Sequence, residues 1–291
     1  MKITNENEKL ESISCVGLVT KPNDTNLGSY FNRIKAALEK YSVRLIVELD
    51  SAKNLDTTGV SFEEMCEKSD FIISLGGDGT LISVCRRSYR YDKPVLGIYA
   101  GQLGFLTDIK SDEIEEFMDN LFLDRYRIDK RMLLEISLQQ GAKIKKIVAF
   151  NDVVFARDNI STISTINAYV RGQMINSYRG DGLIVSTPTG STAYNISAGG
   201  PLVYPLAKIL ILTPICPHSL TQRPLVLPID FDIQFKSDDD VLIVIDGQDR
   251  YKMKDFDNVV IKIANKSAKL IHSLERNYFD ILKEKLNWGS K

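Results

Sequence analysis

The stretch 71-FIISLGGDGT-80 decides how the rest of this chain is interpreted. Five apolar or small residues stop at two glycines, which are followed by one carboxylate, Asp78, a third glycine and a threonine. An apolar run without alternation is typical of a strand that is buried on both faces of a parallel sheet. A glycine-rich turn between such a strand and a helix lets backbone N–H groups approach an anion closely, and phosphate is the usual ligand. The stretch therefore predicts a buried parallel strand followed by a phosphate-binding turn.

The acid at position 78 needs a reason of its own, because a carboxylate repels phosphate oxygens. The repulsion is relieved when a divalent cation bridges the two groups, or when the acid faces a hydroxyl group instead. Both arrangements indicate phosphoryl transfer, in which an acid holds Mg²⁺ or aligns an attacking alcohol. The alternative is an ordinary Asp-Gly turn, and these ten residues alone do not separate the two interpretations.

The order of short apolar runs and longer helical patterns predicts two domains. Up to residue 125, β-rich runs at 13–20, 43–49, 71–75 and 94–100 alternate with helical periods at 27–41, 61–69, 80–91 and 111–122. From Tyr126 onward many short β-like segments are separated by glycine, asparagine, aspartate and proline turns, and 275–288 returns to helical period. We predict a Rossmann-like α/β domain over 1–125, with 272–291 packing back on it, and an all-β domain over 126–271.

Composition excludes several classes of function. The 37 basic and 38 acidic residues leave a net charge of -1, so the totals give no signature of nucleic-acid or anionic-membrane binding. The four cysteines are scattered, no zinc-ligand spacing occurs, and the beginning of the chain is polar rather than apolar. We expect a soluble cytoplasmic protein. GxxxxGK[ST] is absent and 97–104 does not match GxGxxG, which disfavours a P-loop enzyme and a generic dehydrogenase.

A second polar constellation lies in the predicted β domain. Residues 179-RGDGLIVSTPTGSTAYNISAGGP-201 contain more hydroxyl groups and bare backbone than a hydrophobic core tolerates without partners. Such a segment usually lines a polar ligand. The alternative is a solvent loop, and the apolar run before it and Tyr194 within it argue against full exposure.

Four blocks together carry a resemblance: GGDGT at 76–80, LGFLTD at 103–108, DGLIVSTPTGSTAYNISAGGP at 181–201 and LTPICPHSLTQRPLVLP at 212–228. In this order and spacing the chain resembles the NAD kinase family, which phosphorylates the adenosine 2'-hydroxyl of NAD to give NADP. GGDGT also occurs in lipid kinases, whereas the long hydroxyl-rich block does not. The resemblance implies an α/β domain of the GGDGT kinase type and a β domain that binds NAD.

The resemblance also implies roles for individual residues. Asp78 matches the catalytic acid, and Asn151 and Asp152 match an Asn-Glu pair that bonds adenosine and ribose groups. The remaining positions implied to bind substrate or nucleotide are Gly77, Gly79, Thr80, Arg179, Asp181, Thr189, Ser191, Thr192, Ala193, Tyr194, Asn195, Ile196, Ser197 and Gln248. The chain departs from the family pattern at Asp152, which is one methylene shorter than Glu, at Tyr99 and Ala100, and at Asn195 and Ile196.

The implied reaction is an in-line transfer from ATP, or from inorganic polyphosphate, to NAD. Mg²⁺ is expected as cofactor, carried by ATP and touching at most Asp78, with no metal site built from protein groups alone. Expected partners are NAD, NADP and ATP, with no nucleic acid and no membrane, and relatives suggest a homo-oligomer, either a dimer or a tetramer. Two other classes remain open from the sequence: a GGDGT-type lipid kinase and a non-catalytic nucleotide sensor.

Overall fold

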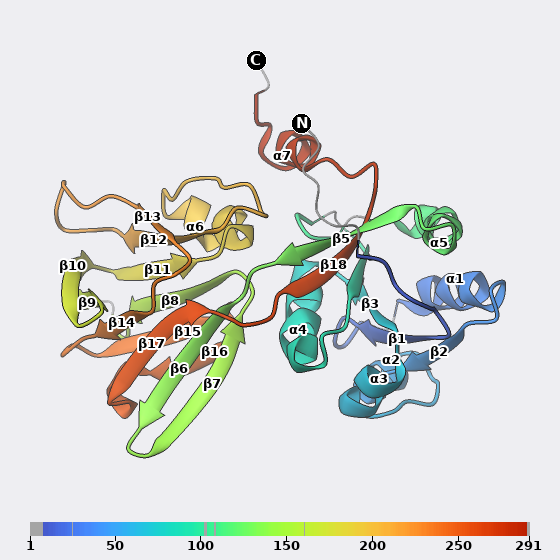
Figure 1. Ribbon diagram of the computed structural model, residues 1–291, viewed down its shortest axis with the longest axis horizontal. Coiled ribbons are helices and arrows are strands. Elements are labelled where there is room, and N and C mark those ends of the chain that lie inside the picture. The colour runs from blue at the N-terminus through green and yellow to red at the C-terminus, as the bar shows by residue number, and fades with distance from the viewer. Residues whose placement is uncertain (1–7, 25, 102–103, 108, 160, 290–291) are drawn as a thin grey trace. The chain divides into compact units, whose positions relative to one another are not determined.

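The chain forms two compact units in the computed structural model, which describes residues 8–24, 26–101, 104–107, 109–159 and 161–289 (Figure 1). The first unit consists of Met1–Lys130 and Ala268–Lys291, and the second consists of Arg131–Ser267. Each unit contains its own cluster of buried hydrophobic residues. Each is therefore described by itself.

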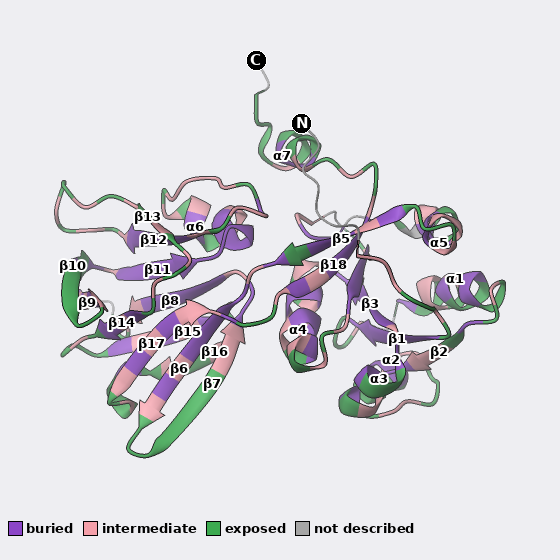
Figure 2. Cartoon of the chain, in the orientation of Figure 1, coloured by how far each residue is buried: buried purple, intermediate pink, exposed green. Residues whose placement is uncertain are grey.

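The first unit is built on a six-stranded sheet in the order β2-β1-β3-β4-β18-β5. Every pairing from β2 to β18 is parallel. The central strands are buried along their whole length, as Figure 2 shows for β1 and β3, because helices cover both faces. The strands are β1 (Cys15–Thr20), β2 (Arg44–Val47), β3 (Phe71–Gly76), β4 (Val95–Tyr99), β5 (Tyr126–Arg131) and β18 (Ala268–Ser273).

Alternation along β3 assigns the helices to the two faces of this sheet. Phe71, Ile73 and Leu75 pack in one core with residues of α1 and α5, whereas the intervening side chains face the side covered by α4. The helical elements of this unit are α1 (Gly28–Glu39), α2 (Leu49–Asn54), α3 (Phe62–Lys68), α4 (Asp78–Ser88), η1 (Tyr89–Tyr91), η2 (Ser111–Glu113), α5 (Ile114–Phe122) and α7 (Tyr278–Leu286). Of these, the short helix α2 was not predicted from the sequence.

The second unit is a sandwich of two antiparallel sheets. The strand orders are β10-β9-β14-β17-β6-β7 and β13-β12-β11-β8-β15-β16. Inward-facing residues of both sheets share one core, in which the rings of Phe155 and Phe235 lie 4.6 Å apart between centroids. In β14 and β15, buried residues alternate with residues that are partly or fully exposed, which fits strands that have one solvent-facing side.

The strands of the sandwich are short and are separated by turns, as the sequence indicated. Their bounds are β6 (Leu134–Gln140), β7 (Lys143–Ala149), β8 (Asp152–Arg157), β9 (Ser164–Val170), β10 (Gln173–Gly180), β11 (Gly182–Ser186), β12 (Ile209–Ile215), β13 (Leu225–Pro228), β14 (Ile233–Lys236), β15 (Val241–Ile245), β16 (Asp249–Lys252) and β17 (Asn258–Ile263). Three single-turn helices, η3 (Thr189–Thr192), α6 (Tyr194–Ser197) and η4 (Met253–Asp255), complete the unit.

The predicted fold class, an α/β domain with a parallel sheet followed by an all-β domain and a C-terminal helix, is confirmed. The unit boundaries lie a few residues away from the predicted ranges 1–125, 126–271 and 272–291. The physical reason is that β5 and β18 pair within the first sheet, although the predicted range of the second domain included β5 and most of β18. Within the described part of the chain, no helix has the length and apolar character needed to cross a membrane.

Candidate functional site

Asp78 stands at the start of α4, directly after the turn that follows β3. Gly77 is the N-cap residue of the helix and carries no capping side chain. The Asp78 carboxylate accepts hydrogen bonds from three successive backbone N–H groups: Oδ2 accepts from Phe105 at 2.7 Å, and Oδ1 accepts from Leu106 at 3.1 Å and from Thr107 at 3.2 Å. The Thr107 hydroxyl adds a longer bond of 3.4 Å to Oδ1. The loop after β4 therefore fixes the orientation of this carboxylate.

The two oxygens of Asp78 differ in their remaining capacity. A carboxylate offers about four acceptor positions, two on each oxygen. Among the described residues, Oδ1 receives three donors and Oδ2 receives one, so Oδ2 keeps an acceptor position for a ligand. An alcohol O–H or a cation can take that position, and these are the two partners that phosphoryl transfer requires of such an acid.

Gly104 touches the same carboxylate. A β-carbon added there would lie 1.9 Å from Oδ1 of Asp78 and 2.4 Å from its Cγ, so a larger residue would have to displace the carboxylate or the loop. The sequence marked this glycine as part of a family block but gave no sign of its contact with Asp78. Leu103 and Asp108 of the same block lie outside the described residues.

The rest of the glycine turn leaves backbone accessible at the helix N-terminus. Gly77 and Thr80 are half-buried, and Gly79 is exposed. The Thr80 N–H donates to the Gly77 carbonyl at 3.1 Å, which closes the first turn of α4. A helix N-terminus with small residues is suited to an anion such as phosphate.

In the second unit, Asn151 and Asp152 are held at the start of β8 by one carboxylate. The side chain of Asp246 accepts from the N–H groups of Phe150, Asn151 and Asp152 at 2.7, 2.7 and 3.0 Å. The Asp246 N–H donates in return to the Asp152 carbonyl at 3.0 Å. These backbone bonds leave the Asn151 and Asp152 side chains without a hydrogen-bond partner among the described residues.

Asp152 is a buried acid without a compensating donor. It is 5% exposed, and burial followed by repulsion from Asp246 raises its pKa from 3.8 to about 7. A buried carboxyl with a strongly raised pKa costs stability in its charged form and is typical of a functional position. The group therefore changes protonation state near neutral pH.

Replacing Asp246 by Asn tests this arrangement. An amide cannot accept on both sides, so at least one of the three N–H groups loses its partner, and we expect the free energy of unfolding to fall by about 1–3 kcal/mol. The loss of the neighbouring charge is expected to lower the pKa of Asp152. Urea unfolding measures the first effect, with Asp255→Asn, an exposed acid on η4, as control. Equal stability of the two variants would contradict the assignment.

Many polar groups of the 186–201 segment form hydrogen bonds with other groups of the protein. The Thr187 hydroxyl donates to the Phe150 carbonyl at 2.8 Å, and the Ser191 hydroxyl donates to the Val203 carbonyl at 3.2 Å. Asn195 is 0% exposed and its amide bonds the carbonyls of Ser191 and Pro201, while its oxygen accepts from Thr213 at 2.6 Å. The structure thus gives the Asn195 side chain an internal role, and the sequence offered no signal of it.

The remaining members of the predicted set differ in burial and in pairing. The Thr189 hydroxyl is buried and has no hydrogen-bond partner among the described residues, and Tyr194 is 47% exposed. Asp181 forms an ion pair of 3.2 Å with Arg157. Of the others, Arg179, Ser197 and Gln248 are exposed, and Thr192, Ala193 and Ile196 are half-buried.

The two groups of residues define a class of protein. A carboxylate fixed beside a glycine turn at a helix N-terminus can align an attacking alcohol for phosphoryl transfer. Together with the parallel α/β unit and the β-sandwich, it defines a small-molecule kinase. The sequence profile of the ATP-NAD kinase N-terminal domain matches residues 16–126, and that of the ATP-NAD kinase C-terminal domain matches residues 150–273. The chain belongs to the NAD kinase family.

Individual relatives are similar to this chain along nearly its whole length. A curated NAD kinase of Sulfurimonas denitrificans is 48% identical over 278 residues, covering 95% of this chain and 98% of that protein. One from Campylobacter jejuni is 48% identical over 281 residues, covering 96% and 98%. The crystal structure of yeast NADH kinase complexed with NADH superposes with a TM-score of 0.86 at 25% identity, covering 96% of this chain and 89% of that one. An NAD kinase from Archaeoglobus fulgidus in complex with ATP gives 0.75 at 25% identity, covering 94% and 98%.

Proposed function

We propose that this protein is an NAD kinase, which transfers the γ-phosphoryl group of ATP to the adenosine 2'-hydroxyl of NAD and releases NADP and ADP. The observation that carries the proposal is the Asp78 carboxylate, which three backbone N–H groups orient and whose Oδ2 keeps an acceptor position for a hydroxyl. The family membership and the relatives named NAD kinase support the substrate. The NADH and ATP complexes of the solved relatives support the two nucleotides as ligands.

Asp78 acts on the attacking alcohol. Its Oδ2 accepts a hydrogen bond from the 2'-hydroxyl and so directs a lone pair of the 2'-oxygen at the γ-phosphorus. The attacking oxygen and the departing ADP are then in line. In a loose transition state the alcohol loses its proton late, so the carboxylate serves mainly to orient and only at the end to receive the proton. Gly77, Gly79 and Thr80 provide the anion-binding end of α4 for a phosphate chain.

The second unit supplies the groups that recognise NAD. The free side chains of Asn151 and Asp152 bond adenosine and ribose groups, and the buried Thr189 hydroxyl gains the partner that it lacks. The half-exposed ring of Tyr194 offers an aromatic face, with Arg179, Asp181, Ser191, Thr192, Ala193, Ile196, Ser197 and Gln248 forming the surroundings. Asn195 contributes by holding the segment in shape rather than by direct contact.

Mg²⁺ is proposed to bind together with ATP. Among the described residues, no group of three or more His, Cys, Asp or Glu side chains is placed to hold a metal ion. The phosphates would carry the ion, and Oδ2 of Asp78 would suit it as a protein ligand only while the 2'-hydroxyl does not occupy the open position of that oxygen. When bound with ATP, the ion would neutralise the charge of the phosphate chain, and the protein's own part is to position Asp78.

The raised pKa of Asp152 gives the reaction a pH signature. Because the ionised carboxylate is a stronger acceptor for ribose hydroxyls than the neutral acid, we expect the KM for NAD to fall as the pH rises through about 7. Asp152→Asn should abolish this step and weaken NAD binding roughly tenfold. The raised pKa of Asp152 also affects folding, but in the opposite direction. The folded state holds a proton on Asp152 that the unfolded state has already released, so this contribution to the free energy of unfolding is lost as the pH rises through about 7. KM profiles between about pH 5.5 and 9 measure the effect, and an unchanged step in Asp152→Asn would assign it to another group.

The decisive experiment is incubation of the purified chain with NAD, Mg²⁺ and either ATP or polyphosphate, with NADP detected by an NADP-specific dehydrogenase. NADP formation with ATP is expected. A lipid kinase would phosphorylate diacylglycerol or a sphingoid base instead, and a sensor would bind NAD without turnover. If neither donor gives NADP, the proposal is overturned. If only polyphosphate gives NADP, polyphosphate replaces ATP as the proposed donor.

Location and assembly belong to the same proposal. Cys15, Cys66 and Cys85 are buried thiols that form no disulfide, which suits a reducing cytoplasm. Exposed apolar residues lie on two strands at sheet edges of the second unit, with Met174 and Ile175 on β10 and Leu225 and Val226 on β13. Such edges favour pairing with a second copy, so we propose a homo-oligomer, a dimer or a tetramer. Light scattering measures its mass in solution, and a monomer would exclude it.

A further inference from the structure

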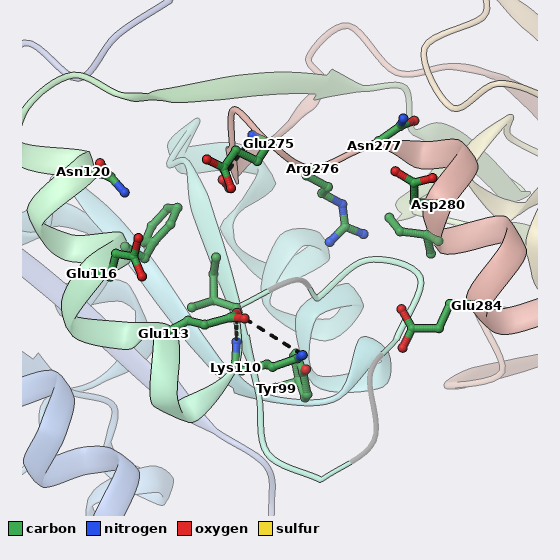
Figure 3. Close-up of a pocket in the computed structure, with 14 residues that line it drawn as sticks. Tyr99, Lys110, Glu113, Glu116, Asn120, Glu275, Arg276, Asn277, Asp280 and Glu284 are labelled. Carbon is green, nitrogen blue, oxygen red and sulfur yellow. Dashed lines mark hydrogen bonds and ion pairs between the residues drawn. The ribbon is translucent and has the colours of Figure 1, made fainter.

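The first unit contains a pocket that the proposed reaction does not use. It has a volume of about 370 Å³ and lies where β4, η2 and α5 meet the segment that leads into α7 (Figure 3). Its apolar surfaces come from buried side chains of Ile109, Phe117 and Ile281. A cavity of this size can bury a small organic molecule.

Tyr99, a largely buried residue, lines this pocket, and its hydroxyl group has no protein partner in the described part of the chain. Tyr99 is 8% exposed, and no described residue forms a hydrogen bond with its hydroxyl group. Burial and the nearby charges of Glu113 and Glu284, which lie on two different sides of the pocket, raise the pKa of the phenol to about 12. The phenol therefore stays neutral. The hydroxyl of a largely buried side chain usually bonds some group, and a ligand in the pocket can supply that partner.

The rim of the pocket is acidic beyond what its own basic residues pair. Five carboxylates face two basic side chains there. Lys110 pairs with Glu113 at 4.0 Å, and the guanidinium of Arg276 donates to the Phe105 carbonyl. Three of the carboxylates, those of Glu116, Glu275 and Glu284, have no ion-pair or hydrogen-bond partner among the described residues, and Figure 3 shows them on different sides of the pocket.

The distances between the free carboxylates of the pocket indicate which kind of cation the pocket can bind. A divalent metal needs its oxygen ligands gathered within about 2.0–2.6 Å of one point. No cluster of three metal-ligating side chains occurs in the described ranges, so the pocket carboxylates are spread too far apart for one ion. A flexible chain of methylenes with ammonium groups along it can reach separate carboxylates, and its methylenes can cover Ile109, Phe117 and Ile281.

We propose that the pocket bounded by Tyr99, Glu116, Glu275 and Glu284 binds a linear aliphatic polyamine. The separate ammonium groups pair with the free carboxylates, and one N–H donates to the Tyr99 hydroxyl oxygen. The methylene segments lie on the apolar surfaces between them. None of the residues that line this pocket belongs to the proposed NAD and ATP sites, and its test requires no turnover of NAD.

Calorimetric titration of the full chain with spermidine tests the proposal. We expect one site, and we expect affinity to fall as salt is raised, because the pairs are partly solvent-exposed. Removing two rim charges in the Glu275→Gln/Glu284→Gln variant is expected to weaken spermidine binding about tenfold. Tyr99→Phe, which keeps the packing and removes only the hydroxyl, is expected to weaken it several-fold.

The matched control is Glu63→Gln/Glu67→Gln, which removes two exposed charges from α3 outside the pocket and should leave the affinity unchanged. Butylamine, with a single ammonium group, is expected to bind at least tenfold more weakly than spermidine. Equal spermidine affinity in the wild-type chain and in the Glu275→Gln/Glu284→Gln variant overturns the proposal. So does equal loss in the α3 control, or displacement of spermidine by Mg²⁺ at matched ionic strength.

Discussion

Asp78→Asn is expected to lower the turnover number of NADP formation by on the order of 10² or more, while the affinity for NAD changes by no more than about threefold. The carboxylate receives three donors on Oδ1 and one on Oδ2. The amide oxygen of Asn can replace Oδ1, but its NH₂ group then faces the Phe105 N–H and cannot accept the substrate hydroxyl. The alcohol loses its orientation, although the substrate is still bound by other groups.

Steady-state kinetics and NAD titration measure the two quantities separately. Asp56→Asn is the matched control, because Asp56 is exposed, lies outside the site and has a left-handed backbone (φ 49°) that Asn tolerates. The control should keep turnover and affinity. Wild-type turnover in Asp78→Asn would remove Asp78 from the reaction, and a parallel loss of NAD affinity would make it a binding residue instead.

The fold was predictable where the signal is local. The apolar run at Phe71–Gly76 and the helical period after it specify a buried strand and α4 through burial patterns that the chain itself carries. The strands β5 and β18 were not assignable in this way. Both have the length and composition of sandwich strands, and their place in the first sheet depends on pairing partners far away in sequence, such as β4 for β18.

In the candidate site, too, the residues that the sequence indicates differ from the distant groups that hold them in place. Asp78, Asn151 and Asp152 stand out in the sequence because they follow special turns or match family positions. Their supports do not stand out: the N–H groups that orient Asp78 come from a loop 27 to 29 residues later, and Asp246 holds Asn151 from 95 residues away. Such contacts are set by strand order and register, which a single sequence does not display. The internal role of Asn195 is hidden for the same reason, since its partner Thr213 lies on β12.

Gly104→Ala is expected to lower turnover by about 10² or more without touching the chemistry of any side chain. The added methyl group would lie 1.9 Å from Oδ1 of Asp78, far inside van der Waals contact, so either the carboxylate or the loop that orients it must move. Overpacking of this kind also costs about 1–3 kcal/mol of stability, which thermal unfolding measures. Gly28→Ala, at a glycine on α1 with no atom within 4 Å of the added carbon, is the control and should keep both activity and stability.

A double-mutant cycle shows whether the methyl group acts through Asp78. If displacement of the carboxylate is the cause, adding Gly104→Ala to Asp78→Asn should reduce turnover by no more than a few-fold further, because the group that it disturbs has already lost its function. Full additivity of the two losses would mean that Gly104 serves the reaction by another route, for example through the path of the loop itself. Wild-type turnover in the single variant would mean that the carboxylate can act from a second position, and the orientation by Phe105, Leu106 and Thr107 would then not be what makes Asp78 catalytic.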